Sequence, residues 1–440
     1  MIENELPETW IVSKLGEVCF TTSGGTPSRK RDDYYGGNIP WVKSGELSKG
    51  LITKTEEYIT EGAVNNSSAK IFPAGTLLIA LYGATIGKLG FLGVDASTNQ
   101  AICGIFKNDV LDLNYLYYFL YHNKNKLIEQ GAGGAQPNIS QTILKDLDVT
   151  LPPLPEQHRI VAKIEELFSE LDKGIETLKT AKQQLKVYRQ AVLKYAFEGR
   201  LTNPDVKDGE LPEGWVRSTL SSECNFSQGI QVDVNLQLLE LKNGCVRFLR
   251  IIDFTQGEDP PRYIKDPGER YHVSKDDVSL VRYGATTGFV CTGKEGVIAN
   301  NLFQVIPKGD LQKKTLFYFL LSPFFQEVVS QNIKGAAMPA ISFGLINDVP
   351  LNFPTSNYNQ LQLVQEIESR LSVCDKIEES IVQGLQQAEA LRQSILKKAF
   401  EGKLVPQDSN DEPASVLLER IKAERGNAQP EKKTRTKKVK

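Results

Sequence analysis

The stretch Leu193-Lys194-Tyr195-Ala196-Phe197-Glu198-Gly199-Arg200-Leu201 returns 203 positions later as Leu396-Lys397-Lys398-Ala399-Phe400-Glu401-Gly402-Lys403-Leu404. Outward from this pair, four further segments recur in the same order at offsets of 200 to 205: Leu6–Trp10 as Leu211–Trp215, Tyr82–Thr85 as Tyr283–Thr286, Leu116–Leu120 as Leu316–Leu320, and Pro137–Ser140 as Pro339–Ser342. Five matches at a nearly fixed offset indicate an internal duplication. The period is too long for a solenoid and fits a module written twice.

Each copy opens with a globular segment, Met1–Leu151 or Leu211–Leu351, that is rich in Gly, Thr and aromatic residues. Short strand-like runs within these segments, such as Gly75–Ala80 and Gly244–Ile252, are bounded by Gly and Pro. One helix is expected in each segment, over Asn114–Gln130 and Lys313–Asn332. The combination predicts a mixed α+β domain in each copy.

Each copy ends in a helical segment. In the first copy, Pro152, Pro153 and Pro155 stop the preceding chain, and Pro155-Glu156 suits the first turn of a helix from about Gln157 to Phe197. Its apolar residues form two seven-residue series, Ile164, Leu171, Leu178, Leu185, Val192 and Ile160, Leu167, Gly174, Ala181, Tyr188, Tyr195. The second copy repeats them as Ile367, Cys374, Ile381, Ala388, Ile395 and Leu363, Ile377, Gly384, Leu391, interrupted by Arg370 and Lys398. Spacing that alternates between four and three predicts a coiled-coil seam.

A helix of this length extends roughly 60 Å at about 1.5 Å per residue, and its apolar stripe needs a partner. The duplication supplies one, and the whole domain between the two helices favours a fold-back, antiparallel pair. Small residues at Gly174, Ala181, Gly384 and Ala388 are expected to let the helices approach closely. The alternative is that each helix packs on the globular domain of its own copy, called its head, or on another chain. The predicted fold is therefore α+β: two globular mixed α+β domains separated by two long helices packed as an antiparallel coiled coil, with an internal pseudo-two-fold repeat.

Composition excludes several classes of protein. The 440 residues are 40% hydrophobic, which is ordinary for globular chains. The acidic start MIENELPETW does not resemble a signal peptide, and no apolar run is long enough to span a membrane. The six cysteines include no C-x-x-C pair, so free thiols in a reducing cytoplasm are expected rather than a zinc site.

Charge gives no support to nucleic-acid binding. Met1–Thr150 carries 13 Lys and Arg against 16 Asp and Glu, and Leu211–Asn352 carries 14 against 15. A stand-alone DNA-binding domain is usually basic, because neutralising phosphates supplies much of its affinity. If this chain binds DNA, it must gather its positive charge on one face or share the DNA with a basic partner.

Several motifs, in this order and duplicated, carry a resemblance to a known family: Ser23–Ser28, Ile39–Leu47, Tyr82–Lys88, Thr98–Ala101 and Leu151–Gln157 running into Ile160-Val161. Over about Leu6–Leu404 the chain resembles the specificity subunits of Type I restriction-modification enzymes. The second copy departs from the pattern, since Ser227–Gln231 replaces the glycine-rich run and Asn357–Gln360 replaces Leu154–Gln157. Such divergence between the two heads fits two different DNA half-sites.

The resemblance implies five segments: a first target-recognition domain over residues 1–152, a first spacer helix over 153–202, a second target-recognition domain over 211–353, a second spacer helix over 355–404, and a short helix with a basic tail over 405–440. It also implies a non-catalytic subunit that reads a bipartite target in double-stranded DNA, in prokaryotic cytoplasm and without membrane contact. Its implied partners are two methyltransferase (modification) subunits and two ATP-driven restriction subunits. No cofactor is expected in this chain, because S-adenosylmethionine, ATP and Mg²⁺ would belong to those partners.

Two motifs come close to enzyme chemistry and fall short of it. Asp259-Pro260-Pro261-Arg262 lacks the fourth-position aromatic that stacks a flipped adenine in methyltransferases. Gly288–Glu295 has P-loop spacing but carries Glu295 where Ser or Thr should hold magnesium. A catalytic methyltransferase or nuclease chain is therefore the weaker alternative. A purely structural coiled-coil scaffold is the third reading, and it gives no reason for two different heads.

Candidate DNA contacts are chosen by residue type and place. In the first head these are Ser28, Arg29, Lys30 and Arg31 in a Gly/Pro-rich loop, Lys43 after a strand-like run, and Tyr82 and Thr85. In the second head they are Gln228, Arg250 (the counterpart of Lys43), Tyr283 and Thr286. Arg can bind guanine O6 and N7 with two hydrogen bonds, and Ser or Thr can bind phosphate. Each group also has a purely structural explanation that needs no DNA contact. The loop is also explained as a solvated charge cluster, and both Tyr-Gly-Ala-Thr segments are also explained as tight turns between strands.

The C-terminal residues contribute two minor expectations. Pro413–Ile421 has the pattern of a short amphipathic helix that could dock on a partner. Lys432–Lys440 holds six basic residues, which suits either a loose phosphate anchor or mere solubility.

Overall fold

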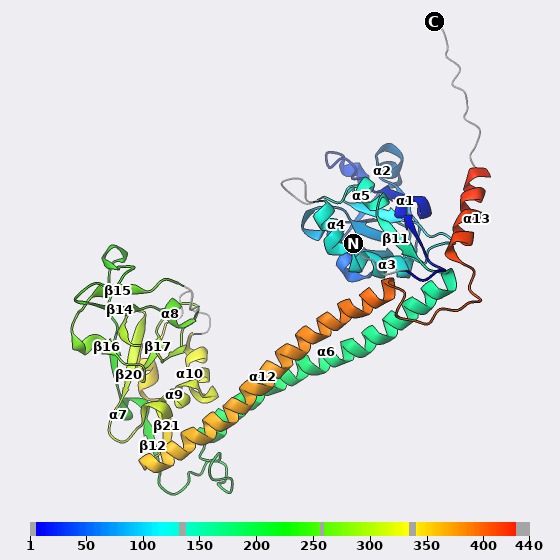
Figure 1. Cartoon of the computed structure of the whole chain (residues 1–440). Coiled ribbons are helices and arrows are strands. Elements are labelled where there is room, and N and C mark those ends of the chain that lie inside the picture. The colour runs from blue at the N-terminus through cyan, green and yellow to red at the C-terminus, as the bar shows by residue number, and fades with distance from the viewer. Residues whose placement is uncertain (1–5, 132–137, 256–258, 334–339, 428–440) are drawn as a thin grey trace. The chain divides into compact units, whose positions relative to one another are not determined.

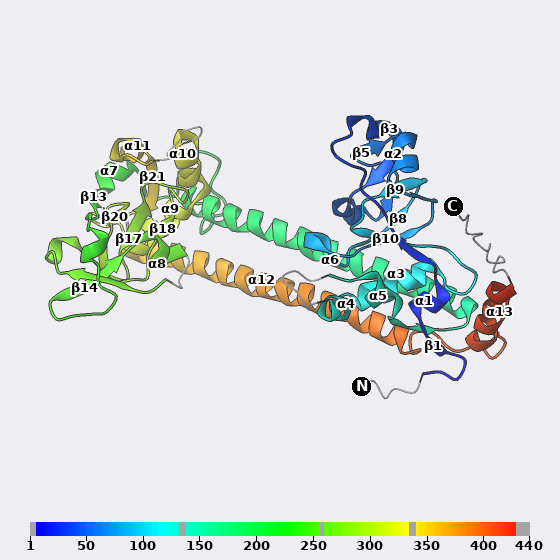
Figure 2. The ribbon, with the colours of Figure 1, turned by 90° about the horizontal axis from the view of Figure 1, so that it is seen from above.

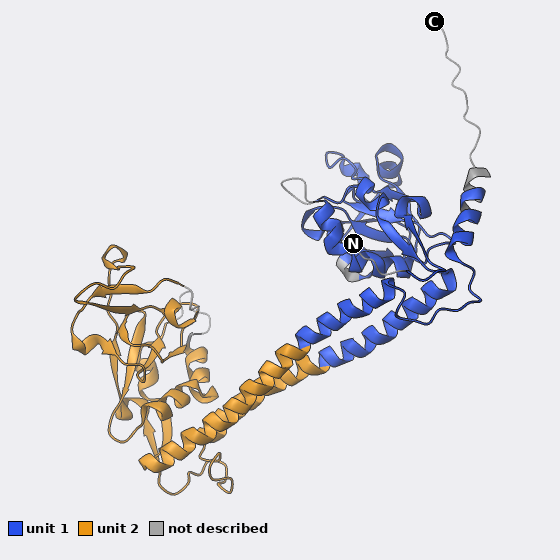
Figure 3. Ribbon diagram, viewed as in Figure 1, with its two compact units in different colours: residues 1–176, 385–440 blue, residues 177–384 orange. Residues whose placement is uncertain are grey.

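The computed structural model describes residues 6–131, 138–255, 259–333 and 340–427. The chain divides into two compact units, residues 1–176 with 385–440 and residues 177–384 (Figure 3). Each unit holds one globular head and a segment of each of two long helices, α6 (Leu154–Phe197) and α12 (Asn357–Phe400), labelled in Figure 1. The fold class predicted from the sequence is confirmed.

The described residues of the first head form three sheets. The antiparallel pair β1 (Ile11–Lys14) and β11 (Asp148–Leu151) joins its two ends. A five-stranded sheet has the order β2 (Thr21–Ser23), β10 (Ile102–Ile105), β7 (Leu77–Ala80), β8 (Leu89–Leu92), β4 (Leu51–Ile52). A four-stranded sheet has the order β5 (Glu57–Ile59), β3 (Tyr35–Val42), β9 (Ala96–Thr98), β6 (Ile71–Phe72). The helices are α1 (Leu15–Val18), α2 (Glu61–Asn66), α3 (Leu113–His122), α4 (Lys124–Gln130) and α5 (Gln141–Lys145), with 3-10 turns at Asp32–Tyr34, Ser44–Lys49 and Gly83–Thr85.

The second head repeats this plan. Its end strands are β12 (Trp215–Thr219) and β21 (Pro350–Pro354). One sheet has the order β13 (Cys224–Gln228), β20 (Leu302–Pro307), β17 (Val278–Val281), β18 (Val290–Cys291), and the other β15 (Arg262–Lys265), β14 (Cys245–Leu249), β19 (Gly296–Ile298), β16 (His272–Val273). The helices are α7 (Leu220–Glu223), α8 (Ile251–Thr255), α9 (Lys313–Leu321), α10 (Pro323–Ile333) and α11 (Phe343–Asn347), with 3-10 turns at Val234–Leu236 and Glu269–Tyr271.

Two boundaries differ from the expected ones for local reasons. The run Gly244–Ile252 is a strand only to Leu249, because the carboxylate of Asp253 accepts a hydrogen bond from the backbone N–H of Arg250 at 2.8 Å and starts α8. The helix expected over Lys313–Asn332 breaks at Ser322, because Pro323 disfavours helical backbone in the residue before it. Its counterpart in the first head breaks at Asn123.

The long helices run antiparallel within each unit (Figures 1 and 2). In the first unit Arg392 pairs with Asp172, and in the second Arg189 pairs with Asp375 and Lys182 with Glu378. The series Ile367, Cys374, Ile381, Ala388 and Ile395 is buried throughout, and the matching series of α6 is buried or half-buried.

The second predicted series is confirmed at Ile160 and Leu363, which are buried, and is wrong at other positions. Tyr188 and Tyr195 on α6 and Ile377 and Leu391 on α12 are exposed. Outside both series, Val161 and Phe168 join the core of the first head and Phe197 joins that of the second, and the ring of Phe168 also lies 4.6 Å from the guanidinium of Arg392 on α12.

The small residues on the seam do not act alike. A Cβ atom at Gly384 would lie 3.1 Å from Leu178 Cδ1, which fits the expected close approach of the helices. Around Gly174 a Cβ atom would meet nothing within 4 Å, so the expectation is wrong there.

The end of α12 is anchored in the core of the first head. Phe400 packs its ring against Tyr115, Phe119 and His122, with centroid separations of 5.4, 5.1 and 5.5 Å. Phe197 makes the corresponding contact with Phe319 in the second head. In each copy, the phenylalanine of the repeated Ala-Phe-Glu-Gly segment therefore packs the end of a long helix into the core of a head.

We expect Phe400→Ala to lower the free energy of unfolding of the first unit by about 3–5 kcal/mol, because it empties a space lined by aromatic rings. Leu391→Ala removes an exposed apolar side chain of the same helix and should change stability by no more than about 0.5 kcal/mol. Denaturant titration of both variants measures the difference. Equal losses would contradict the burial described for α12.

The segment after α12 returns to the first head. The backbone N–H of Ala414 donates to the carbonyl of Thr9 at 3.2 Å, and Ala414 and Leu418 of α13 (Ala414–Asn427) are buried in that head's core. The sequence predicted that this helix could dock on a partner. For the face that carries Ala414 and Leu418 the prediction is wrong, because the first head of the same chain covers that face. The basic run Lys432–Lys440 lies outside the described residues.

Candidate functional site

The candidate residues Lys43 and Arg250 occupy equivalent places in the two heads. Each follows a strand that pairs in parallel with another, β3 with β9 and β14 with β19. In each head a buried carboxylate three positions on accepts a hydrogen bond from the backbone N–H: Glu46 from Lys43 and Asp253 from Arg250, both at 2.8 Å. The chain therefore leaves each strand pair with the same turn and presents a cation there.

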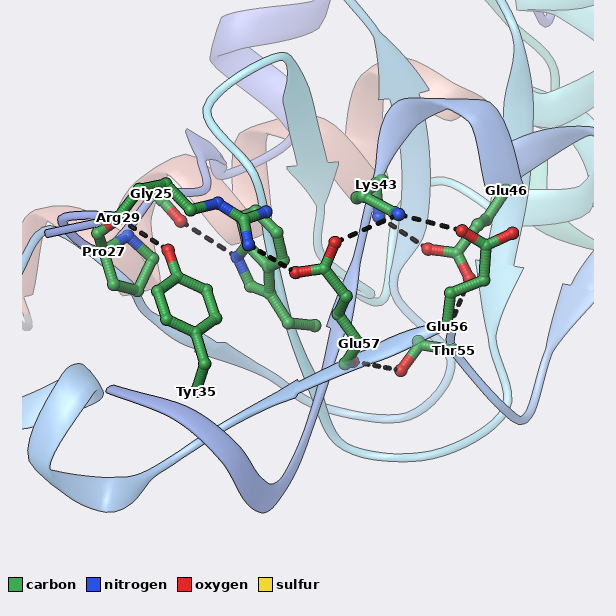
Figure 4. A network of polar contacts seen from close by, with 10 residues as sticks. Gly25, Pro27, Arg29, Tyr35, Lys43, Glu46, Thr55, Glu56 and Glu57 are labelled. Atoms are coloured by element: carbon green, nitrogen blue, oxygen red, sulfur yellow. Dashed lines mark hydrogen bonds and ion pairs between the residues drawn. The ribbon is translucent and has the colours of Figure 1, made fainter. Parts of the chain in front are cut away.

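In the first head, Lys43 belongs to a row of charged groups that also contains Arg29. Glu57 lies between the two cations, with Oε2 at 2.7 Å from Arg29 Nη1 and Oε1 at 3.1 Å from Lys43 Nζ (Figure 4). Lys43 Nζ also contacts Glu56 Oε2 at 2.8 Å. The hydrogen bond from Arg29 lowers the pKa of Glu57, and the hydrogen bonds to Glu56 and Glu57 raise the pKa of Lys43. With all four groups ionised, the two cations and two carboxylates of the row sum to no net charge.

Aromatic side chains fix the loop that carries Arg29. Its guanidinium carbon lies 4.5 Å from the ring centroid of Tyr35 and 5.1 Å from that of Trp41. Both rings are tied to the loop backbone, Tyr35 by its hydroxyl to the carbonyl of Pro27 at 2.7 Å and Trp41 by its indole N–H to the carbonyl of Gly25 at 3.1 Å. Arg29 is thus held in place although its side chain is 55% exposed.

The other residues of this loop are exposed. Ser28, Lys30 and Arg31 lie on the surface, and Arg31 bonds Asp33 through both Nε and Nη2 at 2.7 Å. The structure therefore brings Arg29 and Lys43 into one network and leaves Arg31 in a separate pair.

Arg250 of the second head is enclosed by acceptors. Its Nε lies 3.1 Å from Asp253, its Nη1 2.9 Å from Asp259, and its Nη2 donates to the carbonyl of Pro260 at 3.2 Å. The Asp259–Arg262 segment, which is similar to a methyltransferase motif, thus serves to hold Arg250. The segment with P-loop spacing, Gly288–Glu295, contains β18, ends just before β19 and opens no helix, so it cannot cradle a phosphate as a P-loop does.

Both Tyr-Gly-Ala-Thr segments form tight turns. Gly83 and Gly284 have φ of 79° and 104°, conformations that favour glycine. The carbonyls of Thr85 and Thr286 accept hydrogen bonds from the backbone N–H groups of Lys88 and Phe289. Tyr82 bridges Asn138 and Tyr283 bridges Ala340, so each turn is pinned to the loop before the last short helix of its head. Proximity of these segments to DNA remains a prediction.

Gln228 leads to a residue that the sequence analysis missed. Its Oε1 accepts a hydrogen bond from Arg282 Nη1, and its Nε2 donates to the carbonyl of Asn300 at 3.1 Å. The guanidinium of Arg282 also lies 5.7 Å from the ring centroid of Phe343. The available signal was its position directly before Tyr283 in the duplicated turn.

The described residues contain neither a metal-binding cluster nor a helix suited to span a membrane. No group of three or more His, Cys, Asp or Glu side chains is arranged to hold a metal ion in the described ranges. In the same part of the chain, no helix combines the length and apolarity that a membrane crossing needs.

Comparison with solved structures identifies the fold. A chain solved in a study of complex assembly and conformational transition of the type I R-M system superposes with a TM-score of 0.74 and 21% identity, covering 91% of this chain and 100% of that one. The HsdS subunit of Thermoanaerobacter tengcongensis gives a TM-score of 0.61 with 20% identity, covering 92% and 99%. The architecture is that of a type I specificity subunit.

Sequence comparisons agree. A family model for the Type I restriction modification DNA specificity domain matches residues 7–186. The EcoBI specificity subunit of Escherichia coli is 26% identical, covering 98% of this chain and 95% of its own length, and the StySPI specificity subunit of Salmonella potsdam is 25% identical, covering 99% and 100%. A Type I restriction modification DNA specificity domain is thus matched in residues 7–186, and over nearly its whole length the chain is similar to Type I specificity subunits, so it is a DNA-recognition subunit rather than a catalytic one.

Proposed function

We propose that each head of this chain reads one half of a bipartite target in double-stranded DNA. The observation that carries the proposal is an exchange of charge at one structural position. In the first head Glu57 pairs across the strands with Trp41, and in the second Arg262 pairs with Phe248 at the equivalent register. The backbone frame and the neighbouring aromatic residue are kept while the charge is reversed. Two readers of different sequences, built on one scaffold, would differ in this way.

The charge of the heads supports a shared mode of DNA binding. The network of Arg29 and Lys43 is neutralised by Glu56 and Glu57, and Arg250 is neutralised by Asp253 and Asp259. Such groups give little of the phosphate attraction on which non-specific affinity depends. The heads would discriminate between bases, and basic partner subunits would supply most of the affinity for the DNA phosphate backbone.

We further propose the assembly that the family resemblance implies. Two methyltransferase subunits bind this chain and the DNA, two ATP-driven restriction subunits complete the nuclease, and the complex works in the cytoplasm. S-adenosylmethionine, ATP and Mg²⁺ would bind to those partners. The proposed segment boundaries are those of the sequence analysis, with recognition domains at 1–152 and 211–353, spacer helices at 153–202 and 355–404, and a C-terminal segment at 405–440.

The test separates recognition from catalysis. The purified chain alone should transfer no methyl group from labelled S-adenosylmethionine and cut no DNA with any cofactor. With its methyltransferase subunit, it should direct methylation to a motif with two specified halves around an unspecified gap. Methyl transfer by the pure chain, or a continuous methylated motif, would contradict the proposal.

A further inference from the structure

The arginine side chains of the candidate site differ in which guanidinium nitrogens are occupied. Arg31 uses Nε and Nη2 on Asp33, and Arg250 uses all three nitrogens on Asp253, Asp259 and the carbonyl of Pro260. Arg29 uses only Nη1, on Glu57. Within the described residues, Nε and Nη2 of Arg29 have no hydrogen-bond acceptor. These two nitrogens form one side of the planar guanidinium and point their N–H groups in parallel.

A parallel pair of donors selects its acceptor. In the major groove, guanine offers two adjacent acceptors, O6 and N7, whereas adenine pairs an acceptor with a donor. Phosphate oxygens also accept a pair of hydrogen bonds. Guanine and phosphate are therefore the two groups in DNA that the open edge of Arg29 fits.

The surroundings of Arg29 decide between them. Glu57 is bonded to the same guanidinium, and Glu56 lies on the far side of Lys43, so the row of four groups has no net charge. An approaching phosphate would meet two carboxylates at little Coulomb gain. A guanine edge carries no formal charge and needs only aligned donors. The rings of Tyr35 and Trp41 and the carboxylate of Glu57 supply that alignment before DNA arrives.

We propose that Arg29 reads a guanine in the half-site of the first head through Nε and Nη2, and that Glu57 is the residue that positions it. This inference rests on the proposed function and names one of its contacts. It also gives the two neighbouring arginines different roles. Asp33 already occupies Nε and Nη2 of Arg31, so Arg31 reads no base.

The test uses the full chain assembled with its methyltransferase subunit. DNA duplexes are prepared in which each base pair of the first half-site is varied in turn, and methylation rates are compared. Arg29→Ala should lower discrimination at one G·C pair by roughly 5- to 150-fold, the range for one bidentate contact, and leave the second half-site as selective as before. Arg29→Lys keeps the charge without the paired donors and should lose discrimination at the same position.

Arg31→Ala is the matched control, two residues away in the same loop, and should leave the motif unchanged. Unaltered selectivity at the second half-site shows that each variant complex is folded. If Arg29→Ala weakens methylation equally on all duplexes and flattens its salt dependence, Arg29 binds phosphate and the inference is wrong. A wild-type motif without any G·C pair in the first half would also overturn it.

Glu57→Gln tests the positioning role. The amide oxygen can still accept from Arg29, but the charge is lost, so discrimination should fall at the base pair that Arg29→Ala affects and at no other. The double variant should then lose no more than Arg29→Ala alone. A loss at a different position would mean that Glu57 reads its own base. If the wild-type complex directs no bipartite methylation, the proposed function is wrong. If the wild-type motif is bipartite but stays unchanged in Arg29→Ala and Glu57→Gln, only the role of Arg29 is wrong.

Discussion

Replacing residues of about 1–150 by the corresponding head of a relative is expected to change one half of the methylated motif completely and to leave the other half intact. The reason is that each head carries its own hydrophobic core within its own unit, around Tyr115 and Phe119 in the first and around Phe303 and Phe319 in the second. Motifs are measured by sequencing methylated DNA from cells that express the chimaera with a functional methyltransferase subunit.

The design of the chimaera follows from the contacts that tie the first head to its helices. The indole N–H of Trp10 donates to Glu156 Oε2 at 3.0 Å, and Gln407 Nε2 donates to Glu156 Oε1 at 2.6 Å. A donor head must therefore supply a tryptophan at the place of Trp10, and exchanging the second head should alter the opposite half of the motif. If either exchange altered both halves together, the heads would not be independent readers.

The duplication made much of the fold predictable. The five repeated segments predict two mixed α+β heads. One seven-residue series predicts the two long helices, because the apolar residues of a buried helix face must recur at helical spacing. The second series misled the prediction, because a tyrosine such as Tyr188 fits the period equally well when it faces solvent. Period alone does not reveal how many partners a helix has.

The candidate site was less predictable. The loop Ser28–Arg31 could be selected from its composition, but Arg29 and Arg31 look alike in the sequence. The difference between them comes from Glu57, which is 28 positions away from Arg29 and reaches it only through the pairing of β3 with β5. Pairing register depends on the whole sheet, so the occupied and open edges of a guanidinium become visible only in three dimensions.

Gln157 and Gln360 occupy the same buried place at the start of the two long helices, although the surrounding motif changes between the copies. Gln157 is fully buried, accepts from the backbone N–H of Asp112 at 2.8 Å, and donates to the carbonyls of Val110 and Pro152 at 2.9 and 3.0 Å. Gln360 is equally buried, accepting from the N–H of Gln312 and donating to the carbonyl of Asp310, both at 2.9 Å. Each glutamine thus supplies hydrogen-bonding partners to a loop of its own head.

We expect Gln157→Leu to destabilise the first unit severely, because it strands three backbone groups at about 1–3 kcal/mol for each buried group without a partner. Gln360→Leu strands two groups and should cost the second unit about two thirds as much on the same scale. The exposed Gln386→Leu on α12 is the control and should be nearly neutral. Native-state hydrogen exchange measures each unit separately, and faster exchange should be confined to the unit that carries the substitution. A small effect of Gln157→Leu, comparable with that of Gln386→Leu, would mean that water or a shift of the loop replaces these hydrogen bonds, and that the helix starts are held mainly by their apolar contacts.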